Sequence, residues 1–208
     1  MLFQKKATYL LTGDIGGTNS RMSFYDAGAD CSEDTPLVVK YFRNADHLPE
    51  EVRGDPAAFQ KYIIKPFLKH CWEEAPDKLV ARDNCQIVCC LAIAGIVSNN
   101  SVILTNLGNL SVDGSSVQDD IEEIVSCRII NDFVAQGYGC LTLKPHEVKV
   151  LAGPKTAEQV IKLPVGPKVC VGAGTGLGEC YLTPDDDGVY TCFPSEGYHN
   201  APQSDAVI

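Results

Sequence analysis

Residues 8–25 read Thr-Tyr-Leu-Leu-Thr-Gly-Asp-Ile-Gly-Gly-Thr-Asn-Ser-Arg-Met-Ser-Phe-Tyr. Residues 8–13 are rich in β-forming side chains, and residues 20–25 alternate polar with apolar side chains, as a half-buried strand does. The Gly-rich run 14–19 between them is typical of a turn. This stretch therefore predicts a β-hairpin at the start of the fold.

Strand and helix patterns alternate after this hairpin. Residues 36–42 predict a third strand, and the helical period of 56–74 predicts a helix that Asp55 caps and Pro66 kinks or splits. The continuous apolar run 86–94 predicts a central parallel strand. The next expected elements are a strand at 101–105, a helix at 116–126, a buried strand at 127–131 and a helix from Asp132 to about Leu141. This order predicts an α/β fold with a mixed sheet and helices on its faces.

The pattern changes near residue 143. Short strands are expected at 148–151, 168–172, 178–183 and 189–193, separated by Gly- and Pro-rich turns, and the acidic run 185–188 is expected to be a solvated hairpin turn. We therefore expect two domains, a small α/β domain at 1–142 and the beginning of a larger one at 143–208.

Composition limits the classes of protein that the chain can form. The 208 residues include 17 Lys+Arg and 27 Asp+Glu, for a net charge of −10, and 45% are hydrophobic. These values exclude collagen-like, coiled-coil and wholly disordered chains. The acidic balance argues against nucleic acid as a partner, because phosphate backbones need clustered Lys and Arg. It leaves open a small phosphate ligand held by backbone amides and Mg²⁺.

Neither a signal peptide nor a membrane span is expected, because the apolar run after Lys6 stops at Gly13 and no other is long enough. We therefore expect no membrane partner and a cytoplasmic, reducing location. The ten cysteines are then expected to act as small buried hydrophobes rather than as disulfides. The cysteines in or beside apolar runs are Cys85, Cys89, Cys90, Cys127, Cys170 and Cys180.

Two Gly-rich turns between strands are candidate phosphate loops. In the first, Gly16 and Gly17 allow a ligand close to consecutive backbone N–H groups, Thr18 and Asn19 add donors, and Asp14 can hold Mg²⁺. The second is 172–178, which contains Gly174, Thr175 and Gly176 and lacks both the dinucleotide fingerprint and the P-loop lysine. The alternative for each turn is an ordinary hairpin, and the presence of both together favours phosphate binding.

Two further motifs carry polar side chains suited to a sugar. Asn131 and Asp132 end a buried strand, where α/β folds place ligands, and a carboxylate there can take a proton from an attacking hydroxyl. The alternative role of Asp132 as a helix N-cap is compatible with this one. Glu196 and His199, in Ser-Glu-Gly-Tyr-His at 195–199, can bind neighbouring sugar hydroxyls, although a lone His is more often structural.

Together the four motifs, at 13–21, 129–133, 172–178 and 195–199, resemble the bacterial-type glucokinase family within the sugar kinase and actin-like ATPase superfamily. The resemblance covers essentially the whole chain. It implies two ribonuclease H-like domains separated by a cleft, so that this chain would contain one mixed-sheet domain and the start of a second similar one.

The resemblance also implies site residues. Those for the nucleotide are Asp14, Gly16, Gly17, Thr18 and Asn19 in the first loop and Gly174, Thr175 and Gly176 in the second, with ATP and Mg²⁺ as cofactors and Asp14 beside the metal. Those for glucose are Asn131, Asp132, Glu196 and His199, with Asp132 as the catalytic base.

The implied activity is a glucokinase, which phosphorylates glucose at its 6-hydroxyl as the first step of glycolysis. Relatives continue for well over a hundred residues after the Glu-x-x-His motif, so the chain looks C-terminally truncated, and a homodimer of the full-length form is allowed. The alternatives are a non-catalytic sugar-binding or regulatory fragment and a kinase for another hexose.

Overall fold

The computed structural model describes residues 6–28, 35–153, 156, 165–173 and 177–195. Its contacts divide the chain into two compact units, an N-terminal unit, Met1–Asp132, and a C-terminal unit, Phe133–Ile208.

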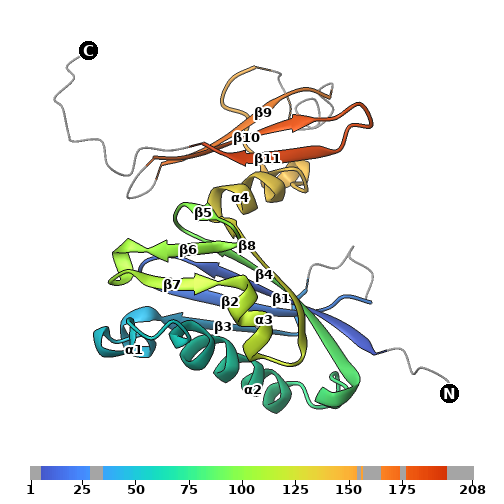
Figure 1. Cartoon of the computed structure of the whole chain (residues 1–208). Coiled ribbons are helices and arrows are strands. Elements are labelled where there is room, and N and C mark those ends of the chain that lie inside the picture. Colours follow the sequence, from blue (N-terminus) through green and yellow to red (C-terminus); the bar gives the residue numbers. More distant parts are fainter. Residues whose placement is uncertain (1–5, 29–34, 154–155, 157–164, 174–176, 196–208) are drawn as a thin grey trace. The chain divides into compact units, whose positions relative to one another are not determined.

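The N-terminal unit is built on a five-stranded sheet of order β3-β2-β1-β4-β8 (Figure 1). Its strands are β1 (Ala7–Ile15), β2 (Asn19–Asp26), β3 (Val38–Arg43), β4 (Cys85–Ile93) and β8 (Ile124–Asn131). The pairs β1–β2 and β2–β3 are antiparallel, whereas β4 pairs in parallel with both β1 and β8. The mixed sheet, the opening hairpin and the central parallel strand are thus confirmed.

Helices cover the apolar face of this sheet. Helix α2 (Lys65–Glu74) follows directly on a π-helical turn, η2 (Gln60–Ile64), and Pro66 lies just after their junction. The irregularity expected at Pro66 is therefore a π-helical turn within a continuous helical run. Buried Phe67 of α2 packs edge-on against Phe42 of β3 at a centroid distance of 6.4 Å. Figure 1 shows α2 running along the sheet.

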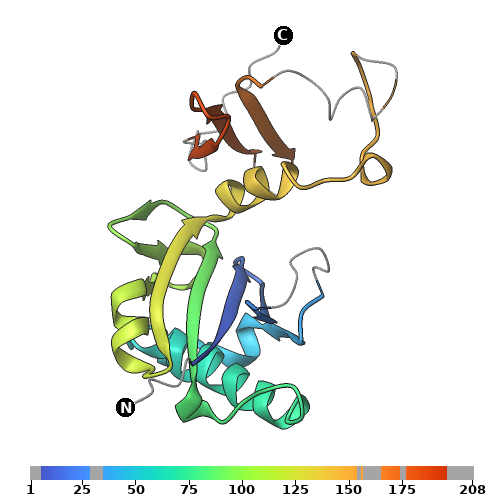
Figure 2. The same ribbon diagram turned by 90° about the vertical axis from the view of Figure 1, so that its right-hand side faces the viewer.

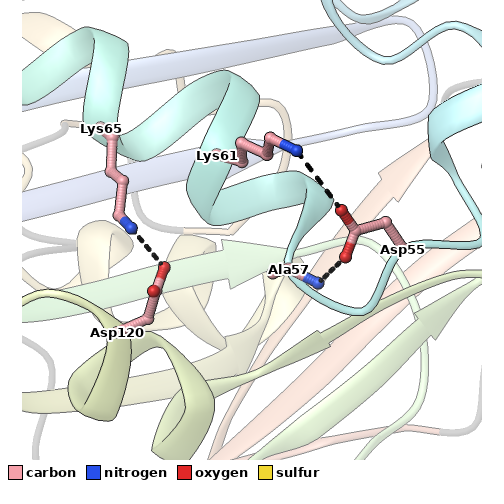
Figure 3. Close-up of polar contacts among 5 residues, drawn as sticks. All are labelled: Asp55, Ala57, Lys61, Lys65 and Asp120. Carbon is pink, nitrogen blue, oxygen red and sulfur yellow. Dashed lines mark hydrogen bonds and ion pairs between the residues drawn. The ribbon is translucent and has the colours of Figure 1, made fainter.

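Helix α3 (Gly114–Asp120) lies beside α2, because Lys65 Nζ is 2.8 Å from Asp120 Oδ2 (Figure 3). Its Val117 is buried in the same core cluster. Before the first helical turn, Asp55 accepts a hydrogen bond from the Ala57 N–H at 2.9 Å and lies 4.0 Å from Lys61 Nζ, which supports its expected capping role.

A small second sheet of the N-terminal unit contains β5 (Val97–Ser98), β6 (Ser101–Leu104) and β7 (Leu110–Asp113). Asn99 and Asn100 form its first turn with φ of 51° and 60°, the left-handed region that asparagine tolerates.

The remaining short helices of the described chain are α1 (Asn44–His47), η1 (Glu50–Val52), η3 (Arg82–Asn84) and η4 (Thr105–Leu107) in the N-terminal unit and η5 (Pro145–Glu147) in the C-terminal unit.

The C-terminal unit packs helix α4 (Asp132–Cys140) against a three-stranded antiparallel sheet (Figure 2). Its strands are β9 (Lys168–Ala173), β10 (Leu177–Pro184) and β11 (Tyr190–Pro194), with β10 in the centre. The turn after β10 is the expected hairpin, in which Asp185 Oδ1 accepts from the N–H groups of Asp187 and Val189.

Two sequence-based expectations differ from the structure. The helix predicted at 116–126 is α3, which starts at Gly114 under the cap of Asp113 and stops at Asp120, because Ile124 already pairs with β4. The strand predicted at 148–151 is absent, since this described segment pairs with no other strand. Contacts group Phe133 and the rest of α4 with the C-terminal sheet.

The nine cysteines in the described part of the chain are all free. Cys85, Cys89, Cys127 and Cys180 are buried, as expected, whereas Cys90 and Cys170 are only half-buried. No helix among the described residues is long and apolar enough to cross a bilayer.

Substitutions at two nearby residues of α2, one buried and one partly exposed, should differ clearly in their effect on stability. Phe67→Ala should lower the free energy of unfolding by about 3–5 kcal/mol, because it leaves a cavity beside Phe42. Lys65→Gln should cost about 0–1 kcal/mol, because both partners of its ion pair are partly exposed. Urea unfolding followed by circular dichroism measures both values, and equal costs would contradict this account of the core.

Candidate functional site

The first candidate loop lies at the carboxyl end of β1. Asp14 is exposed on the face of the sheet opposite the core, while its neighbours Gly13 and Ile15 are buried. The chain turns through Gly16, whose N–H donates to the Asn19 carbonyl at 3.0 Å, and returns as β2. Thr18 and Asn19 are exposed, so their side-chain donors are open to a ligand.

Asn44, which the sequence reasoning missed, holds this loop in place. Its fully buried side chain donates to the Gly16 carbonyl at 2.8 Å and accepts from the Ser20 hydroxyl at 2.8 Å. Its backbone N–H donates to the Thr18 carbonyl at 2.9 Å. One side chain thus fixes both ends of the turn. Burial of a lone asparagine has no local sequence signature, so only the fold could reveal it.

Asn106 lies directly over Gly17. A Cβ atom added at Gly17 would collide with the Asn106 side-chain amide, which would have to move to make room. The loop is therefore held by Asn44 and packed under Asn106, and both residues lie far from it in the sequence. Such a loop is preorganised, which reduces the entropy that ligand binding must cost.

A hollow of about 490 Å³ opens beside the loop. It is lined by Asp14, Gly16, Gly17, Thr18, Asn19, Arg21 and Tyr41. A smaller hollow of about 190 Å³ adjoins it and shares Asp14 and Arg21. The Arg21 guanidinium lies 5.7 Å from the centroid of the Tyr41 ring, a cation–π arrangement that orients the cation. Arg21 of β2 and Tyr41 of β3 are thus added to the residues that the sequence predicted for this site.

Asn131 and Asp132 lie at the same edge of the sheet as Asp14. Ile15, Ile93 and Asn131 occupy one row across the parallel strands β1, β4 and β8. Neighbouring strands are about 4.8 Å apart, so the loop and the Asn-Asp pair are separated by roughly 10 Å along this edge. Both motifs therefore lie at one edge of the sheet, the carboxyl end of its parallel strands, where α/β folds place ligands.

Side-chain amides fix the end of β8. The Asn131 amide donates to the Gly95 carbonyl at 3.0 Å. Asn100 donates to the Cys127 carbonyl at 2.9 Å and accepts from the Ile129 N–H at 2.8 Å. Asp132 is half-buried where the strand passes into α4. The position of Asp132 is therefore set by three asparagine contacts upstream of it.

The other predicted site residues lie outside the described residues. These are Gly174, Thr175, Gly176, Glu196 and His199. The strands on either side of the second loop pair at Ala173 and Leu177, which confirms the two predicted flanking strands. Gly172 and Gly178 lie under the Phe133 ring, where a Cβ atom would collide with it. Two glycines of this motif thus serve packing.

Among the described residues, no three His, Cys, Asp or Glu side chains are grouped so as to hold a metal ion. Asp14 is a single carboxylate beside a hollow. This arrangement matches Mg²⁺, which protein sites often hold through one or two carboxylates, with water and substrate phosphates completing the shell.

The fold and site define a mixed α/β protein with a candidate phosphate loop at the edge of its sheet. Two of the solved structures of similar fold are glucokinases. One, from an Antarctic psychrotroph, has a TM-score of 0.59 and 23% identity over 95% of this chain and 53% of its own. Another, from Balamuthia mandrillaris in complex with glucose, has a TM-score of 0.62 and 22% identity over 94% of this chain and 49% of its own.

The family model described as Glucokinase matches residues 11–206. The chain belongs to the glucokinase family, as the four motifs predicted. Curated relatives include glucokinases of Synechocystis sp., 33% identical over 93% of this chain and 50% of theirs, and of Nostoc sp., 31% identical over 92% and 48%. The chain spans about half the length of the curated relatives it matches.

The Asn44 contacts predict a local effect on the first loop. Asn44→Ala leaves the Gly16 carbonyl and the Ser20 hydroxyl without this partner, which should cost roughly 1–3 kcal/mol of stability. Amide hydrogen exchange of residues 16–19 should accelerate more than that of β4. Asp46→Ala, an exposed change in the same helix, is the matched control and should leave both unchanged. Uniform acceleration across the unit would contradict a specific hold on the loop.

Proposed function

We propose that the chain is the N-terminal part of a glucokinase that transfers the terminal phosphoryl group of ATP to the 6-hydroxyl of glucose. The observation that supports this most directly is the common sheet edge of the Asp14 loop and the Asn131–Asp132 pair. It places the proposed phosphate loop and the proposed base at the same end of the parallel strands. Membership of the glucokinase family supports the choice of substrates.

The first loop is proposed to bind the phosphates of ATP. The backbone N–H groups around Gly17 and the hydroxyl of Thr18 supply donors, while Asn19 adds an amide. Arg21, which lines the same hollow, adds a positive charge in a chain that is acidic overall. Donors fixed before the reaction stabilise the charge that spreads over the transferred group.

Asp14 is proposed to hold Mg²⁺ through one carboxylate oxygen or an intervening water. The fit rests on its exposed carboxylate at a strand end, beside a hollow with room for phosphate oxygens. When bound, the ion neutralises phosphate charge. The role of Asp14 is to keep that charge at the loop.

Asp132 is proposed to be the catalytic base. The 6-hydroxyl of glucose has a pKa far above 7, so it needs a carboxylate that accepts its proton as the new O–P bond forms. Asn131 holds a neighbouring hydroxyl, and Glu196 and His199 complete the glucose site. Positioning of the two substrates supplies most of the remaining acceleration.

The rest of the assignment is proposed on family membership. Gly174, Thr175 and Gly176 form a second phosphate loop, in a second similar domain that begins within 143–208 and follows the small domain at 1–142. The whole protein acts in the cytoplasm on glucose and ATP and forms a homodimer. Nucleic acid and membranes are not among its partners.

Asp132→Asn tests the assignment of the base. The amide keeps the size and the capping ability of the side chain but cannot take a proton, so turnover should fall about 10²–10⁴-fold while glucose affinity changes little. A coupled ADP assay of the full-length protein gives turnover, and calorimetry gives glucose affinity. Asp113→Asn, a second helix cap, is the control and should retain activity.

Near-normal turnover of Asp132→Asn would show that another group is the base. Glucose binding without any binding of ATP analogues by the full-length protein would instead favour a sugar-binding module. A panel of hexoses in the same assay decides the substrate, because a faster reaction with fructose or an amino sugar would contradict glucose as the substrate.

A further inference from the structure

One face of α4 meets the C-terminal sheet through a regular series of contacts. Phe133 covers Gly172 and Gly178, and Gly137, one turn later, lies over β10 and β11. Cys140, at the end of the helix, reaches β9. These three helix positions share one face, since they are separated by four and then three residues.

The face of the sheet that packs against α4 carries three cysteines. Cys170 and Cys180 are directly opposite each other on β9 and β10. Cys192 of β11 is two residues before Pro194, the partner of Cys180, so it lies on the same face. With Cys140 these residues form a four-thiol cluster.

Gly137 brings helix and sheet close together. A Cβ atom added there would lie 2.6 Å from Cys180 Sγ and 2.7 Å from Cys192 Sγ, so only glycine allows this approach. As a result, Cys140 Sγ lies 3.8 Å from Cys170 Sγ. The two sulfur atoms are in van der Waals contact across two different elements.

This pair differs from the other thiols of the cluster in its access to solvent. Cys140 is exposed and Cys170 is half-buried, whereas Cys180 and Cys192 are buried. Cys89 and Cys127, which face each other on β4 and β8 of the N-terminal unit, are buried as well. Among these neighbours, only the pair Cys140 and Cys170 can meet a reagent dissolved in water.

We propose that Cys140 and Cys170 form a reversible disulfide when the protein meets a peroxide. The Cys140 thiolate attacks one peroxide oxygen, the O–O bond breaks, and a sulfenic acid and hydroxide result. The Cys170 sulfur then attacks the Cys140 sulfur, the S–O bond breaks, and the proton of Cys170 leaves with the hydroxide as water. Two thiols lose two electrons in total, and one peroxide becomes two waters. A dithiol reductant reverses the cross-link.

The local structure allows the sulfur atoms to approach the bonding distance of about 2.05 Å. Cys140 is the last residue of α4, and no atom lies within 4 Å of a Cβ built on neighbouring Gly139. Cys140 is also exposed, so its side chain can rotate at the frayed end of the helix to shorten the distance between the two sulfur atoms. Burial raises the pKa of both thiols, so little of either is thiolate at neutral pH. The short distance between the two sulfur atoms offsets this, because it makes the second step effectively unimolecular.

Peptide mapping tests the proposal without any assay of activity. The full chain is treated with hydrogen peroxide, its free thiols are alkylated, and digestion followed by mass spectrometry should find a Cys140–Cys170 cross-link with the loss of two alkylatable thiols. Dithiothreitol should restore both. Cys140→Ser and Cys170→Ser should each abolish the cross-link, whereas Cys90→Ser, a half-buried cysteine on β4, should leave it intact.

Exposed Cys140 can be replaced without disturbing a core, so its variant remains informative if Cys170→Ser fails to fold. Sulfenic or sulfinic acid at Cys140 with no cross-link would overturn the proposal, as would a cross-link that persists in Cys140→Ser. Cross-links between chains, or pairing dominated by Cys89 and Cys127, would overturn it equally.

Discussion

The parallel alignment of β1, β4 and β8 is the constraint on which the candidate site depends. It places Ile15, Ile93 and Asn131 in one row, and therefore brings the residues beside them, Asp14 and Asp132, to one edge. The apolar face of the same strands is sealed by α2 and α3. Since a slip of one residue would turn every side chain to the opposite face, burial of that face also fixes the direction of Asp14.

Much of this arrangement follows from the sequence, because apolar periodicity reports which face of each strand is buried. The hairpin, the central strand β4 and helix α4 were predictable on that basis. Residues 148–151 show the limit of such patterns, since an alternation of polar and apolar side chains forms no strand unless another strand lies beside it to pair with. The end of α3 shows another, because Ile124 joins β4 across a long sequence separation that no local pattern records.

The residues that hold the candidate site were harder to predict than those that line it. Asp14 and Asp132 carry charges at strand ends and were readable from residue type. Asn44, Asn100 and Asn106 are ordinary loop residues in the sequence. Their roles arise from the fold, which brings each one to backbone groups or glycines far along the chain. The motifs of such a site therefore reveal the residues that line it, but not the residues that hold its loops in place.

Glycines in such motifs need separate explanations. Gly17 lies under Asn106, and Gly172 and Gly178 lie under Phe133, so close packing alone accounts for all three. Gly16 is different. Its φ lies outside the left-handed region, and a Cβ there would meet only the Asn19 carbonyl oxygen at an ordinary 3.7 Å. Neither strain nor packing within the described structure requires glycine at this position. The role proposed for this loop would supply a reason, because a side chain at this position would hinder the close approach of a phosphate to the backbone.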